Sequence, residues 1–369
     1  MSLFLERHAG GERALLVHLK LTVDREQDDL EEFENLVQSA GCLPVKVILG
    51  SRVAPDPKCF VGSGKLVEMA SYAQKLAADV VIFNHSLSPS QERNLEIKLC
   101  CKVIDRTTLI LDIFSQRART HEGKLQVELA QLQHLSTKLI RGWTHLERQQ
   151  GGIGTRGPGE TQLEFDKRLI RKRVSTVKSR LIKVQKQREQ NRLRRTRSGL
   201  PVVSLVGYTN VGKSQLFNQL TRADVFVKNQ LFATLDPTMR KGYLNDYGSV
   251  IFADTVGFMS NLPHRLIEAF RATLEEVCQA SLLLHVVDLT VKDVNLSVRR
   301  VKAVLSEIGA QNIPALMVYN KTDIVEAVNP RLDRDATGKP ISVYLSGRSG
   351  AGVEHLRLAV ASRLRLGPK

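Results

Sequence analysis

The sequence has 369 residues, of which 42% are hydrophobic and 25% charged, an ordinary globular composition for two or three domains. It lacks an uninterrupted run of about 18 apolar residues, and its first residues lack a basic stretch followed by an apolar one, so we expect neither a membrane span nor a secretory signal. Five cysteines without C-x-x-C spacing favour reduced thiols, and hence a cytoplasmic protein: Cys42, Cys59, Cys100, Cys101 and Cys278.

The positive charge is concentrated in the middle of the chain. The formal net charge is +16, and residues 106–199 alone hold 22 Lys and Arg against 8 Asp and Glu. Residues 1–105 are slightly acidic, and residues 200–369 are slightly basic. A solvated helix surface usually mixes both signs, so this concentration favours a polyanionic partner, most often a nucleic acid.

Residues 1–105 alternate short apolar runs with stretches of helical periodicity. This pattern predicts a small parallel sheet covered by helices, an N-terminal α/β domain. A Gly-x-Gly run at 62–64 stays open between a structural turn and a site for nucleotide or RNA backbone. We expect strands at 14–19, 45–49, 80–83 and 102–104, and helices at 26–39, 65–77 and 88–99.

Residues 106–199 predict a basic helical hairpin. Apolar residues recur at alternating spacings of four and three, from Leu125 to Leu146 and again from Ile170 to Val184, so two heptad seams can bury each other. Between them, residues 151–160 contain five glycines, which favours a loop that orders only on binding. The second helix is strongly basic, with 14 Lys and Arg in residues 166–197. A basic tip that folds onto RNA is favoured over a plain connector.

Residues 200–369 predict a P-loop G domain with a doubly wound sheet. Apolar strands are expected at 202–206, 249–253, 282–287, 315–319 and 341–345, and a motif or candidate ligand follows each one. Such sheets bind nucleotides at the carboxyl ends of their strands. The order of motifs along the chain therefore fits the order of strands.

The first motif, at 207–214, fits G-x-x-x-x-G-K-[ST], a loop whose backbone amides hold phosphates. Gly207 and Gly212 allow the backbone to wrap closely around the anion. We expect Lys213 to bridge the β- and γ-phosphates and the hydroxyl of Ser214 to ligate Mg²⁺.

Residues 254–257 form the second motif, D-x-x-G. We expect Asp254 to hold Mg²⁺ through a water molecule and the amide of Gly257 to sense the γ-phosphate, which makes this loop a switch. A second hydroxyl ligand of Mg²⁺ is expected from the preceding loop, where Thr234 is favoured over Thr238.

The third motif, N-K-x-D at 320–323, selects the base. Asp323 can accept both edge protons of guanine, a donor pair that adenine lacks, so the ordered motifs predict GTP rather than ATP. Asn320 joins in this recognition, the stem of Lys321 covers the base, and the loop at 346–348 can offer an amide to the guanine oxygen.

Position 258 lacks a residue that many GTPases place there. A glutamine after D-x-x-G orients the attacking water, whereas Phe258 cannot polarise water, so hydrolysis is expected to be slow without a partner or a cation. Asn210 in the phosphate loop is open between an ordinary structural use and a K⁺ site.

Taken with these motifs, the runs at 151–164, 232–238 and 105–132 resemble the HflX family, bacterial GTPases associated with translation. The similarity spans essentially the whole chain. It implies domains at 1–105, 106–199 and 200–369, and binding as a monomer to the large ribosomal subunit and its RNA, with the GTP-bound state splitting stalled or idle ribosomes. It implies catalytic roles for Lys213, Thr234 and Gly257, Mg²⁺ ligands at Ser214 and Thr234, and GTP contacts at Gly207, Tyr208, Thr209, Asn210, Val211, Gly212, Lys213, Ser214, Phe232, Ala233, Thr234, Leu235, Asp236, Asp254, Thr255, Val256, Gly257, Asn320, Lys321, Thr322, Asp323, Ser346, Gly347 and Arg348.

Two departures from the family accompany this resemblance. Gly347 stands where the guanine loop usually has Ala, which is tolerable because the backbone makes the contact. Many members also carry a further C-terminal domain, so the chain, ending at Lys369, resembles a short form. The alternatives are a GTPase of RNA modification or ribosome assembly and a membrane-tethered switch. The sequence shows neither a second catalytic constellation nor a lipid anchor to favour them.

Overall fold

The structure, a computed structural model, describes residues 11–21, 30–142, 158–197, 199–221, 231–232, 234–235, 237–259 and 276–366. The start of the helix expected at 26–39, most of the glycine-rich loop, Ala233 and Asp236 lie outside these residues. The chain divides into two compact units, Met1–Gln116 with Lys124–Ile182 and Arg117–Gly123 with Lys183–Lys369. The division into three domains remains a prediction. No helix in the described residues is long and apolar enough to span a membrane.

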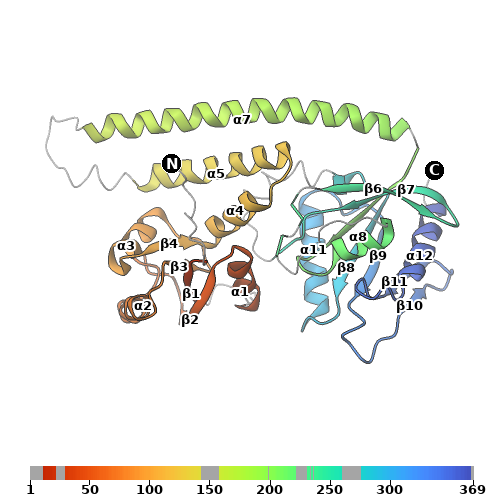
Figure 1. Cartoon of the computed structure of the whole chain (residues 1–369), viewed down its shortest axis with the longest axis horizontal. Coiled ribbons are helices and arrows are strands. Elements are labelled where there is room, and N and C mark those ends of the chain that lie inside the picture. Colours follow the sequence, from red (N-terminus) through yellow and green to blue (C-terminus); the bar gives the residue numbers. More distant parts are fainter. Residues whose placement is uncertain are drawn as a thin grey trace. The chain divides into compact units, whose positions relative to one another are not determined.

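The first unit contains the predicted parallel sheet with helices around it (Figure 1). Its four strands lie in the order β2-β1-β3-β4, and every pair is parallel. Residues 14–17 of the central strand β1 and all four residues of β3 are buried, which explains why these stretches are uninterrupted apolar runs. The elements are β1 (Arg13–Leu21), α1 (Leu30–Ser39), β2 (Leu43–Arg52), α2 (Ser63–Lys75), β3 (Val80–Phe83), α3 (Pro89–Leu99), β4 (Lys102–Asp105) and α4 (Arg106–Arg117).

Helix α3 illustrates how the local sequence fixes an element. The Ser88 hydroxyl accepts a hydrogen bond from the Gln91 amide, and the Gln91 side chain accepts one from the Ser88 amide, which forms a capping box. Pro89 occupies the first turn, where its missing N–H costs nothing. The helix ends at Leu99, and the next residue, Cys100, caps it with a left-handed φ of 52°. Its bounds agree with the predicted span within a residue.

At 62–64, the Gly-x-Gly run leads into α2, which begins at Ser63. Lys65, the cation that would approach a phosphate there, forms an ion pair with Glu68 at 2.8 Å. A nucleotide or RNA site at this turn remains a prediction.

The second unit contains a doubly wound sheet of seven strands in the order β10-β11-β9-β8-β5-β7-β6. Helices α8 and α12 contribute to the apolar cluster on one face, and α11 contributes to that on the other. Strand β8 serves both, because Leu284 joins the first cluster and Leu283 the second. The elements are β5 (Val202–Gly207), α8 (Lys213–Thr221), β6 (Thr238–Leu244), β7 (Gly248–Asp254), β8 (Leu282–Asp288), α11 (Val294–Glu307), β9 (Ala315–Asn320), β10 (Arg331–Arg334), β11 (Pro340–Tyr344) and α12 (Val353–Arg365).

The two edge strands of this sheet were not predicted. Strand β6 pairs antiparallel with β7, and β10 pairs antiparallel with β11. Both edge strands carry exposed basic residues and only partial burial, so they lack the continuous apolar run that marks a central parallel strand. All five predicted strands are present and lie between these edges.

The predicted helical hairpin consists of α5 (His121–Gly142) and α7 (Pro158–Arg197), which lie side by side (Figure 1). Leu125 and Leu129 of α5 are buried, as are Val177 and Leu181 of α7, at the predicted heptad positions. An ion pair of 2.5 Å between Arg173 of α7 and a glutamate of α5 adds a polar contact across the helices.

Replacing Val177 by Asp tests the seam of the hairpin. Val177 is fully buried, so an uncompensated carboxylate there is expected to destabilise the helix pair by about 3 kcal/mol or more. Limited trypsin digestion then cleaves α7 faster than in the wild type. Thr176→Asp, which introduces the same charge on the exposed side of the same turn, is the control and leaves the digestion rate nearly unchanged. Equal digestion rates for both variants would contradict the burial of Val177 between the two helices.

Candidate nucleotide-binding site

The phosphate loop joins β5 to α8 at the carboxyl edge of the sheet. Its backbone follows a strained path, with φ of 62° at Asn210 and 89° at Gly212. A Cβ at Gly212 would lie 2.4 Å from Nδ2 of Asn320, so both the conformation and the space require glycine. The first amides of α8 follow directly, and a helix N-terminus with free amides favours an anion.

Lys213 lies buried at the start of α8, with its ammonium directed back to the loop. Nζ donates hydrogen bonds to the backbone carbonyls of Gly207, at 3.1 Å, and Tyr208, at 2.7 Å. Desolvation by burial lowers the pKa of Lys213 to about 8, although the nearby Asp254 opposes this shift. The lysine therefore occupies a place where an added negative charge stabilises its protonated form.

Three oxygen-bearing side chains from separate motifs converge beside this lysine. The Ser214 hydroxyl donates to Oδ2 of Asp254 at 2.7 Å, the Thr234 hydroxyl donates to the same oxygen at 3.0 Å, and the two hydroxyls are 2.9 Å apart. Burial raises the pKa of Asp254, and its other oxygen, Oδ1, has no hydrogen-bond partner among the described residues.

This donor set fits a hard divalent cation. Hydroxyl and carboxylate oxygens are the ligands that Mg²⁺ takes in phosphate sites, and a cation would compensate the buried carboxylate and its orphaned oxygen. The residues that would hold it are Ser214 and Thr234, with Asp254 behind them. Thr238, the less favoured candidate, begins β6 in register opposite Asp254.

The switch motif is attached to the phosphate loop through its backbone. The Thr209 amide donates to the carbonyl of Phe258 at 2.7 Å, and the Phe258 amide donates to the carbonyl of Gly207 at 3.1 Å. Gly257 lies so close that a Cβ there would be 2.8 Å from Cα of Thr209. A γ-phosphate that draws the Gly257 amide toward itself must therefore also shift Phe258, whose backbone is hydrogen-bonded to Gly207 and Thr209.

The side chain of Phe258 packs into the core of the second unit. It is 3% exposed and belongs to the apolar cluster beneath α11, with Val206, Val277 and Leu283. The sequence identified the missing glutamine, but it gave no sign that position 258 is part of the core. In this structure, position 258 anchors the switch loop.

At the base end of the site, Asn320 joins two loops. Its Nδ2 donates to the carbonyl of Val211 at 2.8 Å, and its Oδ1 accepts from the amide of Gly347 at 2.8 Å. The Gly347 amide was expected to face guanine, but it already donates its hydrogen bond to Asn320. The Ser346 amide donates to the carbonyl of Ala351, which leaves the amide of Arg348 as the candidate in this loop.

Asp288, which belongs to none of the motifs, lies against a residue of the N-K-x-D motif. It ends β8 and forms an ion pair of 2.5 Å with Lys321, the residue expected to cover the base. Its other oxygen accepts from the amide and hydroxyl of Thr290. The available signal was its place, an acid directly after the strand expected at 282–287.

The remaining expected contacts divide into exposed and buried residues. Asp323 is exposed, as recognition of a base requires. Thr255 donates its hydroxyl to the carbonyl of Leu205 and supports the strand ends instead. Also buried in the protein are Thr322, Val256, Phe232 and Leu235.

Comparison with known proteins assigns the chain to a family. Family models for the N-terminal and middle regions of GTP-binding GTPases match residues 27–115 and 117–195, and a 50S ribosome-binding GTPase model matches residues 202–321. GTPase HflX of Escherichia coli (strain K12) is 58% identical over 360 residues, which cover 97% of this chain and 84% of that protein. The chain belongs to the HflX GTPase family. It is therefore a GTP-binding enzyme that hydrolyses GTP.

A second HflX protein agrees with this assignment, and two solved structures share the fold. GTPase HflX of Magnetococcus marinus is 48% identical, over 95% of this chain and 82% of its own length. A crystal structure of a GTP-binding protein from Sulfolobus solfataricus in complex with GDP has the same fold, with a TM-score of 0.50 and 22% identity, and covers 96% of this chain and 99% of that one. The SsGBP and GDP complex gives a TM-score of 0.52 at 22% identity, covering 94% of this chain and 97% of that one.

The low pKa of Lys213 predicts a pH dependence of nucleotide binding. A lysine with a pKa of about 8 loses its charge within the alkaline range, and a neutral amine cannot hold phosphate. The affinity for GDP is expected to be constant near pH 7 and to approach a tenfold fall per pH unit above about pH 8. Calorimetric titration over this range measures it. In Lys213→Met, any remaining pH dependence comes from the ligand alone. If the affinity of this variant falls with pH as steeply as that of the wild type, Lys213 is not the titrating group.

Phe258→Gln tests whether a glutamine at position 258 could orient the attacking water. Because residue 258 faces the core, the amide is buried without a partner, and the melting temperature is expected to fall by about 4 °C or more. Intrinsic GTP hydrolysis, measured by phosphate release, does not rise. Phe258→Leu, which keeps the site apolar, is the control for packing. A clear gain in hydrolysis in the glutamine variant alone would show that this side chain reaches the nucleotide.

Proposed function

We propose that the chain is a slow, Mg²⁺-dependent GTPase that binds the large ribosomal subunit in its GTP-bound state. There it splits or rescues stalled or idle ribosomes, and the ribosome stimulates hydrolysis. The proposal has the chain acting as a monomer in the cytoplasm. The description of the matched G-domain family, a 50S ribosome-binding GTPase, supports the partner.

The observation that carries the proposal is the basic surface of α7. Residues 166–197 hold 14 Lys and Arg against Asp166 and Glu189. Cations in this arrangement can contact successive RNA phosphates, which supply most of the affinity of basic helices for nucleic acid. Those with exposed side chains include Arg168, Arg171, Lys172, Lys178, Arg180, Lys183 and Lys186.

We infer slow hydrolysis from the set of catalytic groups expected at the phosphates, which stabilise charge but do not orient the attacking water. Lys213 can stabilise charge on the transferred phosphoryl group, Thr234 and Ser214 can hold Mg²⁺, and the Gly257 amide can sense the γ-phosphate. With Phe258 in the core, the attacking water needs a group from elsewhere. We infer that the ribosome supplies or orders that group. A K⁺ ion beside Asn210, an exposed residue with a left-handed backbone, would be a further source of positive charge.

Co-sedimentation with large ribosomal subunits tests the proposal. Binding is expected with a non-hydrolysable GTP analogue and to weaken with GDP, and added subunits raise GTP hydrolysis. Comparing GTP hydrolysis in K⁺ and in Na⁺ tests whether K⁺ stimulates the reaction. Binding that ignores the nucleotide contradicts the switch and favours a role in ribosome assembly. Fast hydrolysis without subunits contradicts the need for a partner.

Neutralising four exposed cations of α7 tests the binding surface. Changing Arg171, Lys172, Lys178 and Arg180 to Gln is expected to weaken subunit binding at least about tenfold and to reduce the salt slope by about three units, because each phosphate contact releases counterions. The control removes the same charge from exposed residues outside the hairpin, Lys20, Lys98, Arg240 and Lys241. Equal losses in both variants contradict a specific role for α7.

A further inference from the structure

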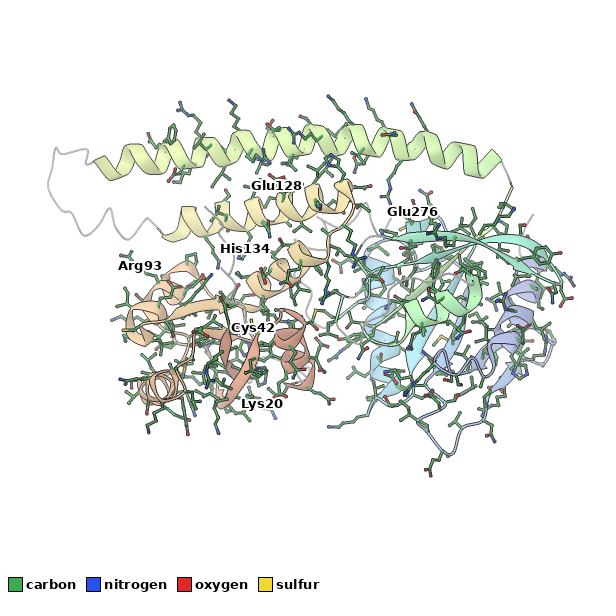
Figure 2. All side chains as sticks on the ribbon, viewed as in Figure 1. Lys20, Cys42, Arg93, Glu128, His134 and Glu276 are labelled. Carbon is green, nitrogen blue, oxygen red and sulfur yellow. The ribbon has the colours of Figure 1, made fainter. Side chains whose placement is uncertain are left out.

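Arg188 of α7 lies between two carboxylates that come from different parts of the chain. Its Nη1 is 2.8 Å from Oε1 of Glu122, in the first turn of α5, and its Nη2 is 3.8 Å from Oε1 of Glu276. Figure 2 labels Glu276 beside the strands of the second unit. All three residues belong to that unit. The glutamate side chains are only 15% and 13% exposed, so solvent screens these ion pairs less than pairs on an open surface.

Glu276 is connected to the switch motif through the apolar core. The next residue, Val277, is fully buried and belongs to the same cluster as Phe258 and Val206. Phe258 directly follows Gly257, and its backbone is bonded to the phosphate loop at Gly207. Close-packed interiors transmit strain, so a displacement of Gly257 toward a γ-phosphate would shift Phe258 and, through the cluster, Val277 and the adjacent Glu276.

The shared guanidinium can adopt two arrangements. It has five N–H donors, enough to serve both carboxylates. In the structure it is hydrogen-bonded to Glu122, whereas Glu276 is within ion-pair distance but beyond hydrogen-bond distance. A displacement of Glu276 by about 1 Å toward Arg188 would form a direct hydrogen bond, and an equal displacement away would take it beyond ion-pair distance. Small movements of the switch are therefore converted into making or breaking a charge-assisted hydrogen bond.

The same arginine fixes both helices of the hairpin where they leave the second unit. Residues 117–123, with the first turn of α5, and residues from Lys183 of α7 onward belong to the second unit, and both helices continue into the first. We propose that Arg188, shared between Glu122 and Glu276, couples the nucleotide state of the G domain to the base of the hairpin. The coupling rests on the switch role proposed for Asp254 and Gly257, but it does not require a ribosome.

Hydrogen–deuterium exchange of the full chain tests the coupling without a ribosome. With Mg²⁺ present, the wild type is compared in GDP and in a non-hydrolysable GTP analogue. Amides in residues 117–130 and 183–197 are expected to exchange about fivefold differently between the two states. Glu276→Gln, which keeps the shape but removes the charge, reduces this difference to below about twofold. GDP affinity and melting temperature stay at wild-type values, which shows that the variant is folded and binds nucleotide.

Glu128 provides a matched control in the same hairpin (Figure 2). It pairs with Arg173 at 2.5 Å, so Glu128→Gln also removes one carboxylate from an ion pair of α5 and α7, but away from the switch. This variant keeps the nucleotide-dependent difference. Arg188→Lys abolishes it, because an ammonium cannot hold two carboxylates in the fixed fork of a guanidinium.

The outcomes separate this coupling from the proposed function. If the wild type shows no difference between GDP and the GTP analogue, the nucleotide switch fails and the coupling fails with it. If the wild type responds and Glu276→Gln responds equally, the coupling alone is wrong and ribosome binding stands. If Glu276→Gln and Glu128→Gln both lose the response, general loss of charge explains it and the role of Arg188 is overturned.

Discussion

The side-chain amide of Asn320 holds the two ends of the nucleotide site in one geometry. It donates to the carbonyl of Val211 in the phosphate loop and accepts from the amide of Gly347 in the last loop, both at 2.8 Å. Being 1% exposed, it makes these bonds away from competing water. The close approach at Gly212 follows from the same contact, because the Asn320 amide fills the space that a side chain would need. One side chain therefore holds the phosphate loop and the last loop in place together.

Buried charge at the other end of the site is balanced only in part. Lys213 and Asp254 are both buried, and burial shifts the pKa of each toward its neutral form. Such a pair is costly to maintain, but its oxygens and ammonium are already placed where Mg²⁺ and phosphates would bring opposite charge. The fold thus carries the desolvation cost before the ligand arrives. Binding relieves it.

The sequence predicted the central strands and the motifs at their ends because both depend on local patterns. Buried parallel strands have continuous apolar runs, and the four motifs follow four of these strands. Strands β6 and β10 were missed since their residues are half polar and their pairing is decided by neighbours distant in sequence. The same limit applies to side-chain direction: neither the burial of Phe258 nor the pairing of Arg188 with Glu276 leaves a local signal. The ion pair of Asp288 with Lys321 was missed for the same reason.

The antiparallel strands at the two edges of the G-domain sheet also affect whether the protein associates with other chains. An unpaired strand edge is a template on which another chain can add a strand. Here β6 presents exposed Arg240 and Lys241, and β10 presents exposed Arg331 and Arg334, with Arg331 also stacked 3.9 Å above the ring of Tyr344. Bringing two such edges together would juxtapose like charges. The positive charge on both edge strands therefore disfavours pairing between the sheets of two copies of the chain.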